Sequence, residues 1–276
     1  MNDRLPSAAV KAQRLARRGG RFVTEPRMVP EETAVALTYN GSTHAVMMAT
    51  PADLEDFAVG FSLTEGFAST IEDIEDIGIV ATGGGIDLQV RMRREVGEAI
   101  ASRRRAMAGP AGCGLCGVES IEAALRPARP VRSGVHFAST DIVSAIAELS
   151  KRQPLNGQTG AAHAAGFHLP GAGIVLVRED VGRHNALDKL IGAMARSGIA
   201  ASTGVIALTC RISVEMVQKA AAFGVPVIAA VSAPTALAVR TADAAGVTLA
   251  ALVRGEEFEL CTHFGRIDGG KAAHVA

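Results

Sequence analysis

The sequence predicts an α/β protein built from two units, and two patterns carry this prediction. In the second half of the chain, expected helices alternate with short apolar strands from about residue 184 to residue 253. Such alternation is typical of a mainly parallel sheet covered by helices. In the first half, two strands joined by a tight turn precede one helix and two further strands, as in a small α+β unit.

The first unit is predicted over residues 21–108. Its clearest signal is the dipeptide Asn40-Gly41, which favours a two-residue hairpin between strands. Thr50 and Pro51 are typical of a helix start, because threonine can cap free N–H groups and proline suits the first helical position. The expected elements are strands over 33–39 and 42–49, a helix that begins near 51 and ends at Gly66, and strands over 77–81 and 86–92.

The second unit is predicted over residues 131–276, after a linker over residues 109–130. The basic residues 1–20 are predicted to form a mobile tail, as chain termini often do. The expected elements of the second unit are helices over 141–152, 184–196, 213–223 and 235–245, and strands over 165–169, 174–178, 205–209, 225–231 and 247–253.

The composition is that of a globular chain, with 48% hydrophobic and 20% charged residues among 276. The formal net charge is zero, so the overall charge favours neither nucleic acid nor membrane as a partner. No apolar run indicates a signal peptide or a membrane span. We therefore expect a cytoplasmic protein in a reducing compartment, where a cysteine pair is reactive or binds metal more often than it forms a disulfide.

The most distinctive stretch is Cys113-Gly114-Leu115-Cys116-Gly117 in the linker. Glycine lets the backbone turn tightly, and C-x-x-C surroundings often lower the pKa of a thiol. A zinc site would need two further ligands, and Cys210 and Cys261 are isolated in the sequence. A redox dithiol of the thioredoxin type would begin a helix within a βαβ unit rather than lie in a linker. A persulfide carrier on a flexible connection is the interpretation that fits best.

Polar side chains follow several of the predicted strands at the points where those strands end. Ligands of open α/β sheets bind at the carboxyl ends of strands, and arginines beside helix N-termini are typical of a phosphate or nucleotide site. Structural alternatives exist, since Asp180 and Ser213 could be helix caps and Asp188 and Lys189 could form a solvated helix face. The predicted ligand-binding residues are Arg183, His184, Asn185, Arg211, Ser213 and Arg254, with His163 as a further candidate.

Several stretches of the chain resemble the FdhD family of formate dehydrogenase accessory sulfurtransferases. The likeness spans about residues 30–267 and rests on many blocks rather than on one motif. These blocks are TPADLEDFAVGF (50–61), TEG (64–66), CGLCG (113–117), TGAAHAA (159–165), EDVGRHNALDK (179–189), RISVEMVQKA (211–220) and SAPT (232–235).

The resemblance implies both a fold and a function. The implied fold is a small β-grasp-like unit followed by a three-layer α/β/α domain similar to cytidine deaminase, without the deaminase zinc chemistry. Members of the family carry sulfur, as a cysteine persulfide, from a cysteine desulfurase to the molybdenum cofactor of formate dehydrogenase. The acceptor is Mo-bis-molybdopterin guanine dinucleotide, and the transfer is needed for formate dehydrogenase activity.

Matching positions imply roles for individual residues. Cys113 corresponds to the persulfide bearer and Cys116 to the second cysteine of the pair. The family's nucleotide-contacting stretch falls on Leu252, Val253, Arg254, Gly255, Glu256 and Glu257.

These implications predict a cytoplasmic, homodimeric sulfurtransferase. We expect a cysteine desulfurase and the formate dehydrogenase catalytic subunit as partners, and the molybdenum cofactor as a transient substrate. We expect no permanent metal, no nucleic acid and no membrane. One alternative is a non-catalytic chaperone of the cofactor or the apo-dehydrogenase. A zinc-dependent nucleoside deaminase is a second alternative, but the ligand spacing that it needs is missing.

Overall fold

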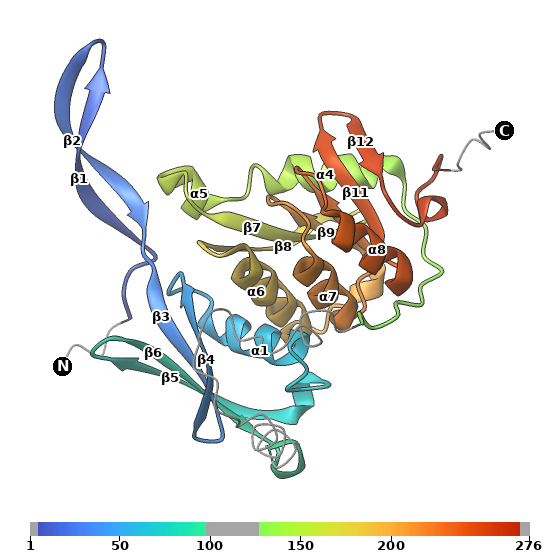
Figure 1. Ribbon diagram of the computed structural model, residues 1–276, viewed down its shortest axis with the longest axis horizontal. Coiled ribbons are helices and arrows are strands. Elements are labelled where there is room, and N and C mark those ends of the chain that lie inside the picture. Colours follow the sequence, from blue (N-terminus) through green and yellow to red (C-terminus); the bar gives the residue numbers. More distant parts are fainter. Residues whose placement is uncertain (1–4, 98–126, 271–276) are drawn as a thin grey trace.

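The chain is a mixed α/β protein in the computed structural model, which describes residues 5–97 and 127–270 (Figure 1). Its described strands form three sheets, of two, four and six strands. The six-stranded sheet and its helices make up the larger body, and the four-stranded sheet with one helix lies beside it (Figure 1).

The four-stranded sheet has the order β4-β3-β6-β5 and carries helix α1 on one face. Asn40 and Gly41 have φ of 45° and 82°, the left-handed values that a two-residue hairpin turn requires. Phe57 of α1 is fully buried against Leu37 and Leu88 of the sheet. The elements are β3 (Thr33–Tyr39), β4 (Ser42–Ala49), α1 (Leu54–Thr64), the 3-10 helix η1 (Ile71–Asp73), β5 (Ile74–Thr82) and β6 (Gly85–Met92).

The expected elements of this unit are confirmed, with one correction at the start of the helix. The residue before the first helical turn is Asp53, not Thr50, and Asp53 makes no side-chain cap hydrogen bond. The Thr50 hydroxyl instead accepts a hydrogen bond from Val181 N at 3.1 Å, so it joins the two units. The helix therefore begins three residues later than its sequence suggested.

The six-stranded sheet has the order β12-β11-β10-β9-β7-β8. Strands β9, β10 and β11 are parallel, whereas the pairs β7–β8, β7–β9 and β11–β12 are antiparallel. The prediction of a mainly parallel sheet was therefore wrong, because short turns join β7 to β8 and β11 to β12 and can link only antiparallel neighbours. The strands are β7 (His163–Leu169), β8 (Gly173–Asp180), β9 (Val205–Leu208), β10 (Val227–Ala230), β11 (Thr248–Arg254) and β12 (Glu257–Leu260).

Helices cover both faces of this sheet. Ile206 and Leu208 point to a core shared with α6, α7 and α8, while Val205 and Ala207 point to a core shared with α4. This alternation follows from the two-residue period of a strand. The elements are α4 (Ser139–Leu149), α5 (Pro154–Thr159), α6 (Arg183–Arg196), η2 (Ala201–Thr203), α7 (Val214–Phe223), α8 (Ala236–Ala245) and η3 (Phe264–Arg266). None of the helices described is long and apolar enough to span a bilayer.

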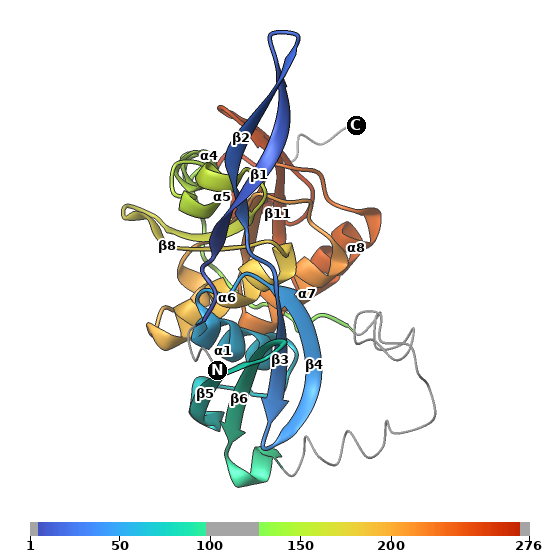
Figure 2. The same ribbon diagram turned by 90° about the vertical axis from the view of Figure 1, so that its left-hand side faces the viewer.

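A two-stranded ribbon projects from the body near the N-terminus (Figures 1 and 2). It pairs β1 (Ala9–Arg18) with β2 (Arg21–Pro30) in ten antiparallel rungs. The prediction of a mobile tail over residues 1–20 was thus wrong for β1. Gly19 and Gly20 have φ of 52° and 84° and form the hairpin turn, a Gly-Gly signal that the sequence does contain.

The two units pack through α1 and α6, which cross at a pair of glycines. A Cβ atom on Gly60 would lie 1.7 Å from Asp188 O, and one on Gly192 would lie 1.9 Å from Asp56 O. Such distances are far below van der Waals contact, so only glycine permits this approach of the two backbones. The close crossing fixes α1 of the first unit against the middle of α6.

Candidate functional site

The predicted ligand-binding residues gather at one edge of the six-stranded sheet, which we call the strand-end edge. Strands β8, β9, β10 and β11 run in the same direction and end there, and β7 begins there. The loops that follow are linked, since Val231 N donates to Leu208 O at 3.2 Å and Leu252 N donates to Ser232 O at 3.4 Å. His163 pairs with Asp180 across β7 and β8. The structure therefore brings together segments that the sequence separates by up to ninety residues.

The first turn of α6 supplies two polar groups without hydrogen-bond partners. Arg183 Nε and His184 Nε2 are both buried atoms, and neither makes a hydrogen bond to a described residue. Glu215 Oε2 lies 3.9 Å from His184 Nε2, too far for a hydrogen bond. Buried polar groups in proteins are nearly always paired, so two unpaired groups in one turn indicate a place where a ligand or water binds.

Two histidines near this turn are held in the neutral form. Burial, with the charges of Arg183 and Lys219, lowers the pKa of His184 to about 4 against the opposing effects of Glu215 and Glu65. Burial also lowers the pKa of His163, again with help from Arg183. At neutral pH these imidazoles therefore offer hydrogen bonds rather than charge, and the positive charge of the edge comes from its arginines.

The loop between β9 and α7 places Arg211 and Ser213. It is fixed by two hydrogen bonds of the buried Ile212, whose N donates to Ala233 O at 3.3 Å and whose O accepts from Thr235 N at 3.0 Å. Arg211 is exposed beside it. Ser213 occupies the N-cap position of α7 but makes no cap hydrogen bond, whereas the Thr235 hydroxyl caps α8 by accepting from Ala238 N at 3.2 Å. Ser213 is therefore not explained as a helix cap alone.

Cys210 lies in the same loop but lacks the properties of a reactive thiol. Its side chain is buried, and burial raises its pKa despite the charges of Arg183 and Arg211 nearby. Burial likewise raises the pKa of Cys261. Both thiols stay protonated at neutral pH, and a protonated thiol is a poor nucleophile.

The stretch Leu252–Glu257 comprises the end of β11, the turn at Gly255 and Glu256, and the first residue of β12. Leu252 has φ of 53°, a left-handed value that is costly for leucine, and a register shift between Ala251 and Arg254 accompanies it. Strain of this kind concentrates at functional sites. Four residues of this stretch are exposed, and Val253 is buried in the core beneath, so only its backbone is available to a ligand. The exposed residues are Arg254, Gly255, Glu256 and Glu257.

Asn185 takes part in a network that joins the two units rather than in the open edge. Its amide nitrogen donates to Met48 O at 2.9 Å and to Asp180 Oδ1 at 3.0 Å. The fully buried Asp180 also accepts from Thr50 N at 2.9 Å and from Lys189 Nζ at 2.6 Å. These contacts make Asn185 a positioning residue that holds the start of α6.

A second buried network lies one turn further along α6. Lys219 Nζ donates to Asp188 Oδ2 at 2.9 Å and to Glu65 Oε1 at 2.7 Å. Burial alone would lower the pKa of Lys219, but Asp188 and Glu65 outweigh it and raise that pKa, so the lysine stays charged. The interpretation of Asp188 and Lys189 as a solvated helix face was wrong, because both are buried. Their partners come from distant segments, which local sequence does not reveal.

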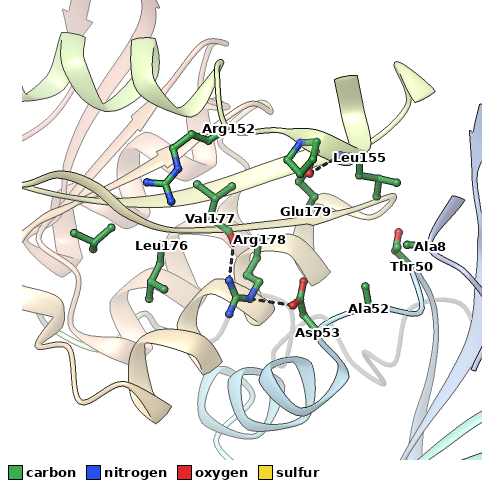
Figure 3. A pocket seen from close by; sticks show the side chains of 12 residues that line it. Ala8, Thr50, Ala52, Asp53, Arg152, Leu155, Leu176, Val177, Arg178 and Glu179 are labelled. Atoms are coloured by element: carbon green, nitrogen blue, oxygen red, sulfur yellow. Dashed lines mark hydrogen bonds and ion pairs between the residues drawn. The ribbon is translucent and has the colours of Figure 1, made fainter. Parts of the chain in front are cut away.

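A pocket of about 600 Å³ lies at the junction of the two units, beside β8 (Figure 3). Figure 3 shows Arg178 between Asp53 and the carbonyl of Val177. Arg178 also binds the buried Asp56 at 2.7 Å. Glu179 accepts from the backbone N–H groups of Leu155 and Asn156, both at 2.8 Å. The charged groups of this pocket are therefore paired with one another or with backbone, in contrast to those of the strand-end edge.

Two further observations concern the cysteine pair and metal binding. Cys113 and Cys116 lie outside the described residues. Within the two described segments, no group of three or more His, Cys, Asp or Glu side chains is arranged to hold a metal ion.

Comparison with known proteins identifies the family of this chain. The profile of the FdhD/NarQ family matches residues 30–268. The chain belongs to this family. The chain is 56% identical over 260 residues to the sulfur carrier protein FdhD of Agrobacterium fabrum, which covers 93% of this chain and 95% of that protein. It is 58% identical over 254 residues to the protein of the same name from Brucella abortus biovar 1, with 92% and 94% covered.

A solved structure supports the fold over nearly the whole chain. It comes from Desulfotalea psychrophila and is described as a formate dehydrogenase accessory protein. The two structures match with a TM-score of 0.75 at 26% identity, covering 94% of this chain and 99% of that one. The family resemblance expected from the sequence blocks is thereby confirmed, along with an α/β fold.

Proposed function

We propose that this chain carries sulfur for the maturation of formate dehydrogenase, with Cys113 as the persulfide bearer. The observation that supports this most is family membership across nearly the whole chain, with close relatives named as sulfur carrier proteins. The glycine-flanked pair Cys113 and Cys116 supplies the chemistry that a carrier needs. The two other cysteines fit a carrier less well, because Cys210 is buried and the pKa of both thiols is raised.

The loading step proposed here is a thiol–persulfide exchange. The Cys113 thiolate attacks the outer sulfur of a cysteine persulfide on a cysteine desulfurase. A new S–S bond forms on Cys113 as the donor S–S bond breaks, and the donor cysteine leaves as a thiolate. Sulfur moves between two thiols in this exchange, so no external oxidant or reductant is needed. We assign Cys116 an assisting role.

The acceptor proposed is Mo-bis-molybdopterin guanine dinucleotide, bound as a transient substrate at the strand-end edge. Arg183, Arg211 and Arg254 would meet its phosphates, since guanidinium groups bind phosphate in a forked geometry. The unpaired Arg183 Nε and His184 Nε2 and the strained turn at Leu252 support a ligand at this place. Among the described residues, none of these three arginines forms an ion pair with a carboxylate, unlike Arg178 in the pocket beside β8.

Mass spectrometry after incubation with a desulfurase and cysteine tests the carrier. Wild type should gain sulfur, Cys113→Ala should not, and the matched controls Cys210→Ala and Cys261→Ala should load like wild type. Equal loading of Cys113→Ala would contradict the assignment.

Complementation of formate dehydrogenase activity separates this function from that of a non-catalytic chaperone. The Cys113→Ser, Cys116→Ser double variant should fail to restore activity if the chain carries sulfur, and it should restore activity if the chain only protects the cofactor. The proposal includes a homodimer in the cytoplasm, and sedimentation of the purified chain tests the dimer.

A further inference from the structure

The ribbon of β1 and β2 contains none of the residues assigned to the strand-end edge. It extends away from both units (Figures 1 and 2). None of the residues of β1 or β2, all of which the structure describes, is buried. At its base Arg27 donates to Thr159 O of the second unit at 2.6 Å. An isolated two-stranded hairpin is marginally stable in water, so a ribbon of this length is expected to gain stability from a partner.

The charge of the ribbon is strongly one-sided. It carries six cationic side chains and one carboxylate, Glu25, although the formal net charge of the whole chain is zero. Glu25 pairs with Arg14 at 2.7 Å and with Arg18 at 3.2 Å. The other cations make no ion pair with any residue that the structure describes, and they are Lys11, Arg17, Arg21 and Arg27.

Large apolar side chains lie exposed among these cations. Leu15 is 66% exposed and Phe22 is 68% exposed. These are the two most exposed large hydrophobic residues that the structure describes. The pairing register puts Leu15 and Phe22 on one face of the ribbon with Arg17, because opposite residues of an antiparallel pair share a face. Val23 lies on the other face with Arg21, so both faces combine apolar and cationic groups.

This composition fits a protein surface better than a bilayer or a nucleic acid. Membrane-surface elements segregate their apolar residues on one face, whereas here both faces carry them. Binding to duplex phosphates is driven by cations and does not require exposed leucine and phenylalanine. Five of the six cations are arginine, which together with aromatic residues is enriched in protein interfaces, while lysine is depleted there. Arginine also binds carboxylates through two parallel hydrogen bonds.

We propose that the ribbon is a docking arm for an acidic surface on the formate dehydrogenase catalytic subunit. Phe22 and Leu15 would enter an apolar hollow of that surface, and the free arginines would pair with carboxylates around it. The choice of the dehydrogenase as occupant rests on the proposed function. The arm would hold the acceptor enzyme beside the chain while the strand-end edge handles the cofactor.

Biolayer interferometry with the immobilised catalytic subunit tests this docking. The two test variants are Leu15→Ala, Phe22→Ala and the charge reversal Arg17→Glu, Arg21→Glu. Each should weaken binding about tenfold or more, as expected for central aromatic and arginine contacts. Added salt should weaken wild type more than the charge-reversed variant. The matched controls are Val46→Ala and Arg240→Glu, which alter one exposed apolar residue and one exposed arginine outside the ribbon and should bind like wild type.

Unchanged affinity of both test variants for the catalytic subunit would overturn the proposal. Loss of binding to phosphatidylserine vesicles or to duplex DNA, with the subunit still bound normally, would likewise overturn it. Sulfur loading of Cys113 should be unaffected in both variants, and circular dichroism checks that they fold. If wild type itself fails to load sulfur, the proposed function fails, while the binding comparison still decides whether the ribbon docks on the subunit.

Discussion

The first two residues of α6 and the polar residues that follow them lie in opposite environments. Arg183 Nε and His184 Nε2 are buried and make no hydrogen bond to any residue that the structure describes. Asn185, Asp188 and Lys189 are buried as well, yet each is bonded to groups that reach across from other segments. One 14-residue helix thus begins with two unpaired groups at the strand-end edge and contacts the first unit through residues that follow them.

This difference indicates that one contiguous block of sequence can contribute both to a ligand-binding edge and to the packing of the two units. Residues 179–189 form one uninterrupted family block that contains both kinds of polar residue. Removing one partner of a buried charge pair leaves an uncompensated charge in a low-dielectric interior, which is costly. Removing an unpaired group at a binding edge leaves no such charge. The two parts of α6 should therefore respond differently to substitution.

The largest effect is expected at the anchor, for Lys189→Met. Lys189 Nζ bonds Asp180 Oδ2 at 2.6 Å and Thr50 O at 2.8 Å, and both charged side chains are fully buried. Loss of the cation should lower the free energy of unfolding by about 3–5 kcal/mol. Urea denaturation measures this, with the exposed Lys151→Met as control, for which we expect a change within about 0.5 kcal/mol. A loss below about 1 kcal/mol for Lys189→Met would show that the pair does not anchor the units.

The next effect is expected at the helix crossing, for Gly60→Ala. The added methyl group would meet the backbone of Asp188, which cannot move aside as a side chain can. Overpacking of this kind costs about 1–3 kcal/mol or more. Gly157 of α5 has open space around it, so Gly157→Ala is a matched control that should be neutral or slightly stabilising. Equal stability of the two variants in thermal unfolding would contradict the close crossing.

The smallest effect concerns pH and His184. Its pKa is about 4 in the folded chain against an ordinary 6.5, so between these values the unfolded chain binds the proton and the folded chain does not. The free energy of unfolding should therefore fall as the pH is lowered from 6.5 towards 4. The share of His184 should be on the order of 1 kcal/mol, because 30% of its side chain is exposed. His184→Gln should reduce the dependence of the unfolding free energy on pH, as measured by denaturation at several pH values. An unchanged dependence would show that the imidazole is hydrated and keeps its ordinary pKa.

Much of the fold could be predicted because local signals determine its elements. The Asn40-Gly41 turn, the apolar runs of β9 and β10 and the order of helices and strands in the second unit all lie in contiguous sequence. The strand-end edge followed from that order, because the ends of parallel strands meet at one edge. The antiparallel pairs at both sides of the sheet did not follow, since pairing between strands is a non-local property.

The remaining features depend on partners distant in sequence. From the sequence alone Lys189 resembles a surface lysine, but in the structure it is bonded to Thr50 and Asp180. Asp188 is bonded to Lys219, which is thirty-one residues away in sequence. The ribbon was missed because its many arginines obscured the Gly-Gly turn. The cysteine pair was found from spacing alone and lies outside the described residues.

The central claim is that the strand-end edge binds the guanine nucleotide end of the cofactor through groups that the protein leaves unpaired. Calorimetric titration of the full chain with GDP tests it most directly. The matched control is Lys151→Ala, which removes an exposed cation at the opposite edge of the sheet. Its neighbour Arg152 marks this position, because Arg152 donates to Ile174 O at the start of β8. Arg183→Ala should bind GDP about tenfold more weakly than wild type and Lys151→Ala, with unchanged unfolding. Equal affinity of all three proteins would contradict the claim.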